Sequence, residues 1–361
     1  MEIALQVLPG AAPALALELE RIGLPALESA DGSTEELTLE APGDSAPLKL
    51  LAGLRTAVAA YVIITSPAPR PTGLTATEVI REFRAVRELL AQQRPRVRFT
   101  GLRLEAAGSH TPQMQRVAQE LADAAGVELD PEEGDLLVRV RRGPTGPGAS
   151  EGQRFDDDRD GDARGWELLV RTTPRPLATR AWRTQRYPGA LNATIAAAVV
   201  EAMEPDPQDR FADLMCGSGT LVIERMARGR CEAVRGWDLS PEAIAVTQAH
   251  LRGARVRGPV SIEVGDVAGL ALDGEAPFTK IVANPPWGEL LGSHQTNDAL
   301  HASLLDAIDR LGSPDVLAGI LTHDIRRFEA ALEADPRWRL LDAHRYFAKG
   351  HHPRLFRLVR A

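Results

Sequence analysis

The sequence predicts an α/β protein whose C-terminal half forms a doubly wound parallel sheet. From residue 191 onward, apolar runs of strand length alternate with helical patterns. Several of these strands end in an acidic or amide residue, at the edge where open α/β sheets bind ligands. The N-terminal half mixes strands and helices without that regular alternation, which predicts α+β units ahead of the sheet.

The first 66 residues alternate strand and helix patterns in the order β-α-β-α-β. The predicted strands cover residues 2–8, 37–40 and 57–65, and the predicted helices cover residues 13–23 and 46–54. Prolines then recur at every second position from Pro67 to Pro71 and indicate a linker. We therefore expect a small α+β unit over residues 1–66.

A second α+β unit is predicted over residues 67–175, with arginines along its strands. Helical patterns cover residues 77–93 and 111–126, and strand patterns cover residues 96–105, 136–142 and 166–173. Arginines on one face would suit phosphate contacts, although arginines also solvate strands that bind nothing. The candidates for RNA contact are Arg96, Arg98, Arg139, Arg141 and Arg142.

Residues 143–165 are rich in Gly, Pro and Asp and predict a surface loop. Its acidic residues match the calcium-loop pattern of an EF-hand at Asp156, Asp158, Asp160, Gly161 and Glu167. However, no helix precedes the first of these residues, and the last lies in a predicted strand. We therefore interpret the segment as an acidic solvated loop and expect no metal site.

Charge and composition are those of an ordinary globular protein. The 361 residues are 44% hydrophobic and 25% charged, with a formal net charge of -8. That charge argues against a surface that binds nucleic acid throughout but permits a local basic face. No apolar run reaches the roughly 20 residues that span a bilayer, no signal-peptide pattern opens the chain, and Cys216 and Cys231 are the two cysteines. These features predict a cytoplasmic protein.

The C-terminal half follows a proline-containing connector over residues 176–190. Helical patterns cover residues 191–203, 298–311 and 324–334, and further helices begin at residues 220 and 240. Strand patterns cover residues 210–214, 232–237, 260–264, 280–283, 315–322, 337–346 and 355–360. The final two strands predict a hairpin that closes the sheet.

The stretch Asp213-Leu-Met-Cys-Gly-Ser-Gly-Thr220 predicts a strand, a glycine turn and the start of a helix. Gly217 and Gly219 allow the backbone to approach a ligand closely, and the helix start offers free N–H groups. The dinucleotide fingerprint would require glycine at Val222, and the sequence contains no G-K-[ST] motif. A dinucleotide site of the usual form and a P-loop are therefore excluded.

Three strand-end carboxylates suit a nucleoside that carries an amino-acid group. Asp238 can accept hydrogen bonds from ribose hydroxyls, Asp266 can accept one from the amine of adenine, and Asp213 can face an ammonium group. Each residue alone could be a helix cap. Three of them at consecutive strand ends around a glycine turn favour S-adenosylmethionine as the cofactor.

The stretch Asn284-Pro-Pro-Trp287 predicts chemistry on the amino group of a flat base. The lone pair of such an amine is conjugated with the ring, and accepting hydrogen bonds from both of its N–H groups frees it. The Asn284 side-chain oxygen and the Pro285 carbonyl can accept those bonds, and Pro286 stiffens the loop. Trp287 can stack on the base, which contributes roughly 1–3 kcal/mol in other base–aromatic contacts.

These stretches resemble the amino-directed S-adenosylmethionine-dependent methyltransferases. The segments DLMCGSGTLVIE over residues 213–224 and RYPGALNAT over residues 186–194 resemble, more narrowly, THUMP-domain RNA methyltransferases. The resemblance implies an N-terminal ferredoxin-like domain (1–66), a THUMP RNA-binding domain (67–175), a linker (176–190) and a Rossmann-like methyltransferase domain (191–361). Trp287 departs from the usual Tyr or Phe, and the acidic loop is an insertion.

The resemblance also implies roles for individual residues. Catalysis would fall to Asn284, Pro285, Pro286 and Trp287. The cofactor would contact Asn192, Asp213, Met215, Cys216, Gly217, Gly219, Thr220, Asp238, Leu239, Asp266, Val267 and Asn284. RNA beside the active site could be held by Arg326, Arg327, Lys349 and Arg354.

Within that family the architecture is similar to tRNA guanine-N2-methyltransferases of the acceptor stem. The resemblance implies a monomer that grips the CCA end and forms N2-methylguanosine at position six. Two other enzyme activities stay open, adenine-N6 methylation and rRNA guanine-N2 methylation. The third alternative is an RNA-binding protein without catalytic activity.

Overall fold

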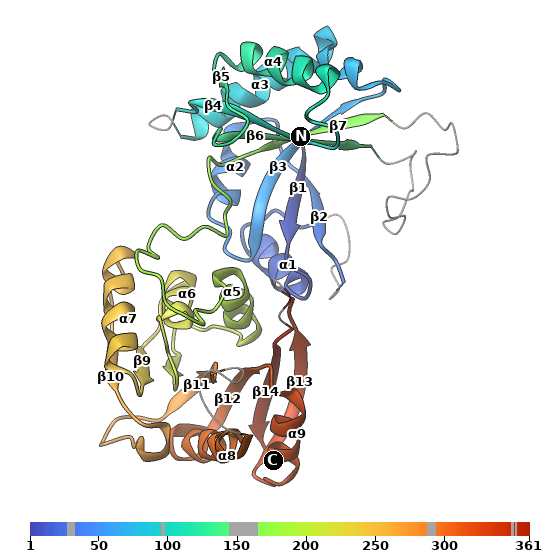
Figure 1. Ribbon diagram of the computed structural model, residues 1–361. Helices are drawn as coiled ribbons and strands as arrows, with labels where there is room; N and C mark the ends of the chain where they lie inside the picture. The colour runs from blue at the N-terminus through green and yellow to red at the C-terminus, as the bar shows by residue number, and fades with distance from the viewer. Residues whose placement is uncertain (27–32, 95–97, 144–164, 287–293, 348–349, 351) are drawn as a thin grey trace. The chain divides into compact units, whose positions relative to one another are not determined.

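The computed structural model describes residues 1–26, 33–94, 98–143, 165–286, 294–347, 350 and 352–361 (Figure 1). The chain separates into two compact units. The N-terminal unit consists mainly of residues 36–177, and the C-terminal unit consists mainly of residues 178–361. Residues Val7–Glu18, with the start of helix α1 (Ala12–Arg21), group with the C-terminal unit. None of the described helices is long and apolar enough to cross a membrane.

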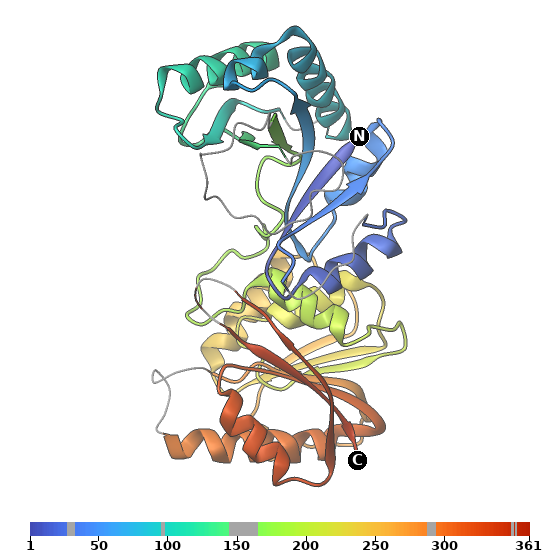
Figure 2. The same ribbon diagram turned by 90° about the vertical axis from the view of Figure 1, so that its right-hand side faces the viewer.

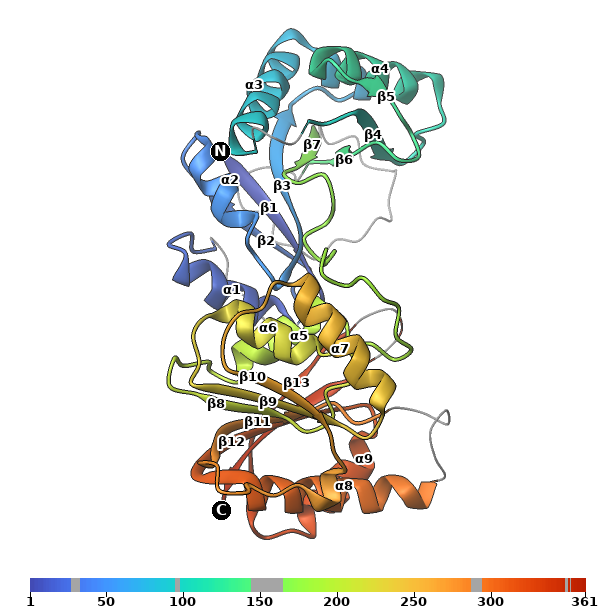
Figure 3. The ribbon, with the colours of Figure 1, turned by 90° about the vertical axis from the view of Figure 1, so that its left-hand side faces the viewer.

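The N-terminal unit contains a seven-stranded sheet in the order β2-β1-β3-β7-β6-β4-β5. Helices α2, α3 and α4 pack against one another, and α3 and α4 cover one face of the sheet (Figures 1 and 3). The strands are β1 Glu2–Val7, β2 Glu36–Glu40, β3 Ala57–Ser66, β4 Gly101–Ala106, β5 Glu128–Leu129, β6 Leu136–Arg142 and β7 Trp166–Arg171. The helices are α2 Ser45–Leu51, the 3-10 helix η1 Pro71–Thr75, α3 Thr77–Gln93 and α4 Pro112–Ala125.

Strand β3 joins the two predicted α+β units into this one sheet. It pairs antiparallel with β7, with Ile63 opposite Leu169, and it also neighbours β1. Strands predicted on either side of residue 66 therefore share one hydrogen-bonded ladder. The division into separate ferredoxin-like and THUMP domains remains a prediction.

Strand β4 begins later than the sequence pattern predicts. The alternation of Arg96 to Phe99 predicted a strand from residue 96, but the strand begins at Gly101. Just before it, the N–H groups of Thr100 and Gly101 donate to Asp135 Oδ1 (2.8 and 3.2 Å). A side chain from a distant segment thus satisfies donors that a longer strand would have paired, and local alternation could not reveal it.

The C-terminal unit contains the predicted doubly wound sheet, in the order β10-β9-β8-β11-β12-β14-β13. Strands β10, β9, β8, β11 and β12 pair in parallel, and β14 pairs antiparallel with both β12 and β13. The strands are β8 Arg210–Asp213, β9 Ala233–Asp238, β10 Val260–Val264, β11 Phe278–Ala283, β12 Gly312–Thr322, β13 Trp338–Arg345 and β14 Arg354–Arg360.

Helices cover both faces of this sheet. Helices α5, α6 and α7 lie on one face, and α8 and α9 lie on the other (Figures 2 and 3). The core between the sheet and α8 contains Ile281, Leu304 and Phe328. The helices are α5 Ala193–Ala202, α6 Thr220–Arg228, α7 Pro241–Gly253, α8 His294–Leu311 and α9 Ile325–Glu333, and the 3-10 helix η2 covers Val267–Gly269.

The order in which strands are added to the sheet reverses between β8 and β11, although these two strands run in parallel. The chain runs outward from β8 through β9 to β10, then returns to β11 on the other side of β8. In open α/β sheets, the crevice beyond the carboxyl ends of two such strands is the usual ligand site. The residues that end β8 and follow β11 are therefore the first candidates for a ligand site.

Candidate active site

Asp213 and Asn284 lie at the carboxyl ends of these two neighbouring strands. Asp213 ends β8, and Asn284 follows the last residue of β11. The strands pair in parallel with Val282 opposite Asp213, and Leu214 N–H donates to the Val282 carbonyl (2.9 Å). Strand pairing thus brings together two residues that are 71 positions apart in the chain.

Both residues present a buried oxygen that has no hydrogen-bond donor among the described residues. These atoms are Asp213 Oδ2 and Asn284 Oδ1. Asp213 is 1% exposed, and its other oxygen accepts a bond from Met215 N–H (3.4 Å). An unsatisfied buried acceptor costs roughly 1–3 kcal/mol, so such atoms normally meet a partner. The pair is arranged to accept hydrogen bonds from a ligand.

Burial raises the pKa of Asp213 to about 8, and the nearby charge of Asp238 adds to the effect. Without a ligand, the carboxyl group is therefore largely protonated below that pH. A cationic group beside it would lower the pKa and hold the carboxylate in its charged form.

The glycine turn has one face packed and one face open. Gly217 and Gly219 have positive φ angles of 52° and 76°, which glycine adopts readily. A Cβ at Gly219 would lie 2.6 Å from Thr247 Cγ2, so that position cannot take a side chain without displacing it. A Cβ at Gly217 would meet only Tyr187 Cε1, at 3.9 Å. The Gly217 side of the turn therefore leaves room for a ligand.

Asp238 supports the turn from the end of β9. Its Oδ2 accepts from Gly217 N–H (2.9 Å), and its Oδ1 accepts from Ser240 N–H (2.9 Å). A carboxylate has about four lone-pair sites, so it can still accept bonds from ribose hydroxyls. Beside it, Leu239 is 68% exposed and Val264 is 54% exposed. Exposed apolar side chains around a carboxylate suit the faces of a nucleoside base.

The structure gives the other predicted cofactor residues differing settings. Asp266 is exposed and caps η2 by accepting from Ala268 N–H (3.0 Å). Val267 is buried in the core, and Met215 packs against that core. Asn192 Oδ1 caps α5 by accepting from Thr194 N–H (2.8 Å). These side chains cap helices or pack in the core, so they have fewer free polar atoms for a ligand than Asp213 and Asn284.

Cys216 and Thr220 are also buried. Thr220 Oγ1 accepts from Arg183 Nη2 (3.1 Å), and Cys216 N–H donates to the Trp237 carbonyl (2.8 Å). Burial raises the pKa of the Cys216 thiol well above its usual value, and the nearby Asp213 and Asp238 add to this. The thiol stays protonated at neutral pH.

In the loop that begins at Asn284, Pro285 is buried and Pro286 is exposed. Several other predicted residues lie outside the described part of the chain. The residues outside the description are Trp287, Arg96, Lys349, Asp156, Asp158, Asp160 and Gly161. Their roles stay predictions.

Glu167 is described, and it is engaged by an arginine. It is buried on β7, where its Oε2 accepts from Arg141 Nε (2.6 Å). Across the described residues, no group of three or more His, Cys, Asp or Glu side chains could hold a metal ion.

The predicted basic strands of the N-terminal unit carry their own carboxylates. Arg139 pairs with Glu105 (2.7 Å), and Arg141 pairs with both Glu167 (2.6 Å) and Glu36 (2.8 Å). The other two described candidates have different settings. Arg142 donates to the Pro69 carbonyl (3.1 Å) and lies over the Trp166 ring, and Arg98 is exposed.

The C-terminal arginine candidates show the same contrast. Arg327 pairs with Asp324 (3.2 Å), and Arg354 pairs with Glu329 (2.7 Å). Arg326 is exposed on α9. An RNA phosphate would therefore meet Arg326 without displacing a carboxylate that the structure records.

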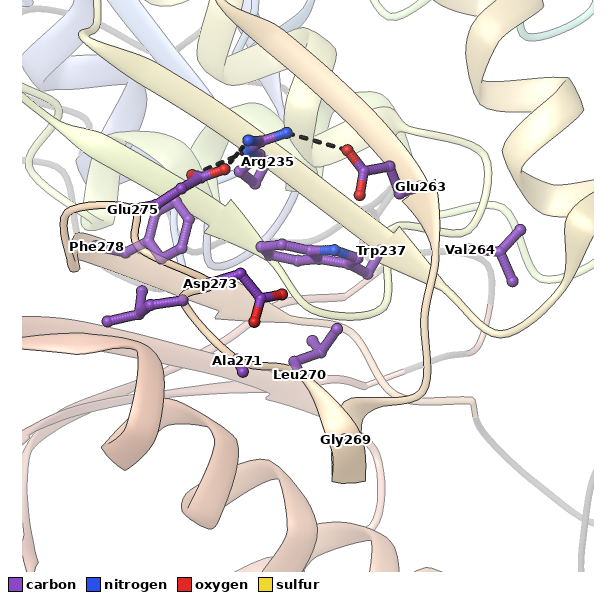
Figure 4. Close-up of a pocket in the computed structure, with 11 residues that line it drawn as sticks. Arg235, Trp237, Glu263, Val264, Gly269, Leu270, Ala271, Asp273, Glu275 and Phe278 are labelled. Atoms are coloured by element: carbon purple, nitrogen blue, oxygen red, sulfur yellow. Dashed lines mark hydrogen bonds and ion pairs between the residues drawn. The ribbon is translucent and has the colours of Figure 1, made fainter.

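A cavity of about 230 Å³ lies under the loop between β10 and β11 (Figure 4). Trp237 forms its floor, and Arg235 bridges Glu263 and Glu275 at its rim. Side chains alternate along a strand, so Arg235 and Trp237 face away from the side that Gly236 and Asp238 present to the glycine turn. The cavity is therefore separate from the strand ends at Asp213 and Asn284.

Sequence reasoning missed three residues beside the glycine turn. Thr247 Oγ1 donates to the Gly217 carbonyl (2.7 Å), and His250 lies 3.0 Å from the Ser218 carbonyl. Tyr187 lies beside Gly217. Tyr187 belongs to the RYPGALNAT segment, which could have indicated it, but a helical Thr and a lone His carry no such signal.

Strand order, glycine turn and strand-end residues together define the C-terminal unit as a Rossmann-like methyltransferase fold. Residues 180–354 match a family model described as UPF0020: RMKL-like, methyltransferase domain. The match covers 175 of the 361 residues, just under half of the chain, and this part of the chain is similar to the methyltransferase domain of that family.

Three curated relatives are similar in sequence. The chain is 28% identical over 180 residues to an Archaeoglobus fulgidus tRNA (guanine(6)-N2)-methyltransferase, covering 43% of this chain and 45% of that protein. It is 28% identical to the Mus musculus tRNA (guanine(6)-N(2))-methyltransferase THUMP3, over 40% of this chain and 31% of the relative. It is 27% identical to the Vibrio campbellii ribosomal RNA large subunit methyltransferase K/L, over 35% of this chain and 24% of the relative. The matches thus span less than half of each relative.

Solved structures share the fold over the whole chain. TrmN from Thermus thermophilus superposes with a TM-score of 0.72 at 20% identity, covering 100% of this chain and 99% of that one. SMU.472, complexed with SAH, superposes with a TM-score of 0.63 at 14% identity, covering 100% and 98%. At these identities the likeness establishes the fold alone.

Proposed function

We propose that this protein is an S-adenosylmethionine-dependent RNA methyltransferase that modifies the N2 amine of guanine. The observation that supports this most directly is that Asn284 Oδ1 and Asp213 Oδ2, at the ends of neighbouring strands, are buried without a hydrogen-bond donor among the described residues. The Asn284 oxygen suits an amino group on a base, and the Asp213 oxygen suits the ammonium group of a methionine. Their strands are neighbours, so both ligands would meet in one crevice.

The residues present fit S-adenosylmethionine. Asp213 would face its ammonium group, Asp238 would accept bonds from its ribose hydroxyls, and Leu239 would cover its adenine. The open side of Gly217 leaves space for the ligand backbone. The bound cofactor would supply an electrophilic methyl group. The product of transfer, S-adenosylhomocysteine (SAH), keeps the ammonium, ribose and adenine groups and would make the same contacts.

Asn284 would prepare the acceptor amine. Accepting an N–H bond at Oδ1 draws electron density onto the amine nitrogen, whose lone pair otherwise conjugates with the ring. The new N–C bond then forms as the S–C bond breaks, and the cationic amine releases one proton to water. No strong base is needed, because such a proton is acidic.

We further propose tRNA as the substrate, with the modified guanine at position six of the acceptor stem. The names of the archaeal and mouse relatives support this target. The N-terminal unit, as a ferredoxin-like and THUMP pair, would hold the CCA end, and the target base would flip out of the stem to reach Asn284. The chain would act as a monomer in the cytoplasm.

A methylation assay with defined RNAs tests this proposal. The purified chain is given labelled S-adenosylmethionine with a tRNA transcript, the same transcript with guanine six replaced, or a large-subunit rRNA fragment. The products are digested to nucleosides and separated. We expect N2-methylguanosine from the first tRNA alone. Product from rRNA would favour the activity named for the Vibrio relative. N6-methyladenosine would overturn the guanine assignment, and no product from any RNA would favour a non-catalytic protein.

A further inference from the structure

The predicted linker is firmly attached to the methyltransferase fold. We call residues 178–190 the anchor segment; they group with the C-terminal unit. Arg180 Nε donates to Glu224 Oε1 on α6 (2.9 Å), and these side chains are 6% and 0% exposed. Arg183 Nη2 donates to the Leu191 carbonyl (2.8 Å) and to Thr220 Oγ1 (3.1 Å). Buried charges without such partners would be costly, so this geometry fixes the segment on α6.

Trp182 fastens the anchor segment to α7. It is buried, and its ring meets the His250 ring edge-on with centroids 5.3 Å apart. A Cβ at Gly253 would lie 2.8 Å from the Trp182 carbonyl oxygen, so α7 carries glycine where the segment crosses it. Helix and segment therefore pack in direct contact.

His250 connects the anchor segment to the glycine turn. Its ring is 1% exposed, Nε2 lies 3.2 Å from both the backbone nitrogen and the carbonyl oxygen of Gln185, and Nδ1 lies 3.0 Å from the Ser218 carbonyl oxygen. A carbonyl only accepts, so the Ser218 contact calls for a proton on Nδ1, and in a neutral ring Nε2 then accepts from Gln185 N–H. One turn earlier, Thr247 Oγ1 donates to the Gly217 carbonyl (2.7 Å). Two α7 side chains thus hold successive carbonyls of the turn.

Tyr187 follows Gln185 by two residues and lies beside the open face of the turn. Its Cε1 is the atom that a Cβ at Gly217 would meet, at 3.9 Å. The ring is half-buried, and the acidic groups near its phenol include Asp238 and Glu242. Tyr187 therefore lies within electrostatic range of Asp238, the carboxylate assigned above to the ribose hydroxyls.

We propose that His250 is a positioning residue that locks the anchor segment to the glycine turn, and that Tyr187 is thereby held as a wall of the cofactor site. This inference rests on the proposed function, because it assigns the same crevice to S-adenosylmethionine. Phenol and ring of Tyr187 would contact the nucleoside part of the cofactor. His250 itself touches no ligand and acts only through Gln185 and Ser218.

Substitutions at His250 separate hydrogen bonding from packing. H250F keeps an aromatic ring against Trp182 but removes both bonds, whereas H250Q can donate to Ser218 and accept from Gln185. Calorimetry with SAH as the probe should show about tenfold weaker binding for H250F and binding within about threefold of wild type for H250Q, since a lost buried pair of bonds is worth about 1.4 kcal/mol or more. H301F is the matched control, because His301 is also buried and edge-on to a ring, that of Phe328. It should lose stability but not SAH affinity.

Two further measurements do not depend on the folding of H250F. Nitrogen NMR of the His250 ring in the wild-type chain should show the proton on Nδ1; a proton on Nε2 alone would overturn the positioning role. Y187A should weaken SAH binding about tenfold with an unchanged melting temperature, and unchanged affinity would overturn the role of Tyr187. If wild type failed to bind SAH, the proposed function would fall together with this inference. If wild type bound SAH and H250F bound it equally well, only the inference would fall.

Discussion

The two regions singled out by the sequence satisfy their polar groups in opposite ways. At the carboxyl ends of β8 and β11, Asp213 and Asn284 keep buried oxygens without a donor among the described residues. On β6 in the N-terminal unit, Arg139 and Arg141 are already paired with glutamates from other strands of the sheet. The first region can therefore accept hydrogen bonds from a ligand, whereas the second has its charges paired within the protein.

This difference separates residues that define a site from residues that stabilise a fold. An RNA phosphate at Arg141 would have to displace Glu167 and Glu36, and it would gain little over the pairs it broke. A ligand donor at Asn284 displaces nothing that the structure records. Exposed arginines such as Arg98 are therefore better candidates for RNA contact than the paired arginines beside them.

The largest expected effect is at Asn284. Asn284→Ala removes the acceptor for the base amine, so we expect the rate of methyl transfer to fall by about a hundredfold to a thousandfold, as when an oxyanion-hole donor is removed. Affinity for SAH should change by less than about threefold, because Asp213 and Asp238 remain. Methyl transfer to tRNA and calorimetry with SAH measure the two quantities. Equal loss of both would contradict the separation of roles.

Asp213→Asn should weaken SAH binding by about tenfold and remove its pH dependence. In wild type, the raised pKa of about 8 means that an ammonium group must expel a proton from Asp213 at lower pH. Affinity should therefore increase from pH 6 to pH 8 in wild type and stay flat in the variant. Calorimetry at several pH values checks this, and a flat wild-type profile would argue against an ammonium beside Asp213.

Asp213 should also shape stability in the absence of ligand. Its folded-state pKa of about 8 lies above that of the unfolded chain, about 4. Between these values the folded state holds a proton that the unfolded state has lost, so the carboxyl makes the fold less stable as pH rises. The melting temperature of Asp213→Asn, relative to wild type, should therefore rise from pH 5 to pH 8. A constant difference would contradict the buried, protonated form.

Substitutions at Arg141 and Arg98 should have smaller effects, on stability at the first and on RNA binding at the second. Arg141→Ala should leave the buried Glu167 without its partner and destabilise the fold by about 1–3 kcal/mol, with RNA affinity changed by less than about threefold. Arg98→Ala should leave stability unchanged and weaken RNA binding by about threefold to tenfold at low salt. Thermal unfolding and filter binding at two salt concentrations measure both. If Arg141→Ala lost more RNA affinity than Arg98→Ala, the comparison would be reversed.

Calcium should have the smallest effect. Glu167, the last residue of the calcium-like pattern, is committed to Arg141 (2.6 Å). Calorimetry with millimolar calcium chloride should therefore show no binding, and the melting temperature should not move. A saturable heat would show that the acidic residues 156–161 bind the ion.

Sequence patterns predicted most elements because each has its own periodicity. Helix α3 and strands β6 and β10 begin and end where the patterns predicted. The failures involve partners distant in sequence. Asp135 decides where β4 begins, and the local patterns did not indicate that β3 pairs with β7 in one sheet.

The site shows the same division between local and distant information. Glycines and strand-end acids can be recognised by residue type, so the positions of Asp213, Asp238 and Asn284 at the ends of strands were predictable. Nothing in the sequence around His250 distinguishes it from any helical histidine, because its role depends on Gln185 and Ser218, which meet it only in the folded chain. Likewise, the pairing of Arg139 with Glu105 and of Arg141 with Glu167 depends on strand register.

The burial of Cys216 bears on whether a methyl donor in this site could alkylate the protein itself. A thiolate is a far better nucleophile than a base amine, and one held in this turn would compete for an electrophilic methyl group. The depth of Cys216 and its two acidic neighbours, Asp213 and Asp238, keep it as an unreactive thiol. The carboxylates that would recognise the methyl donor thereby also suppress self-alkylation of the protein that holds it.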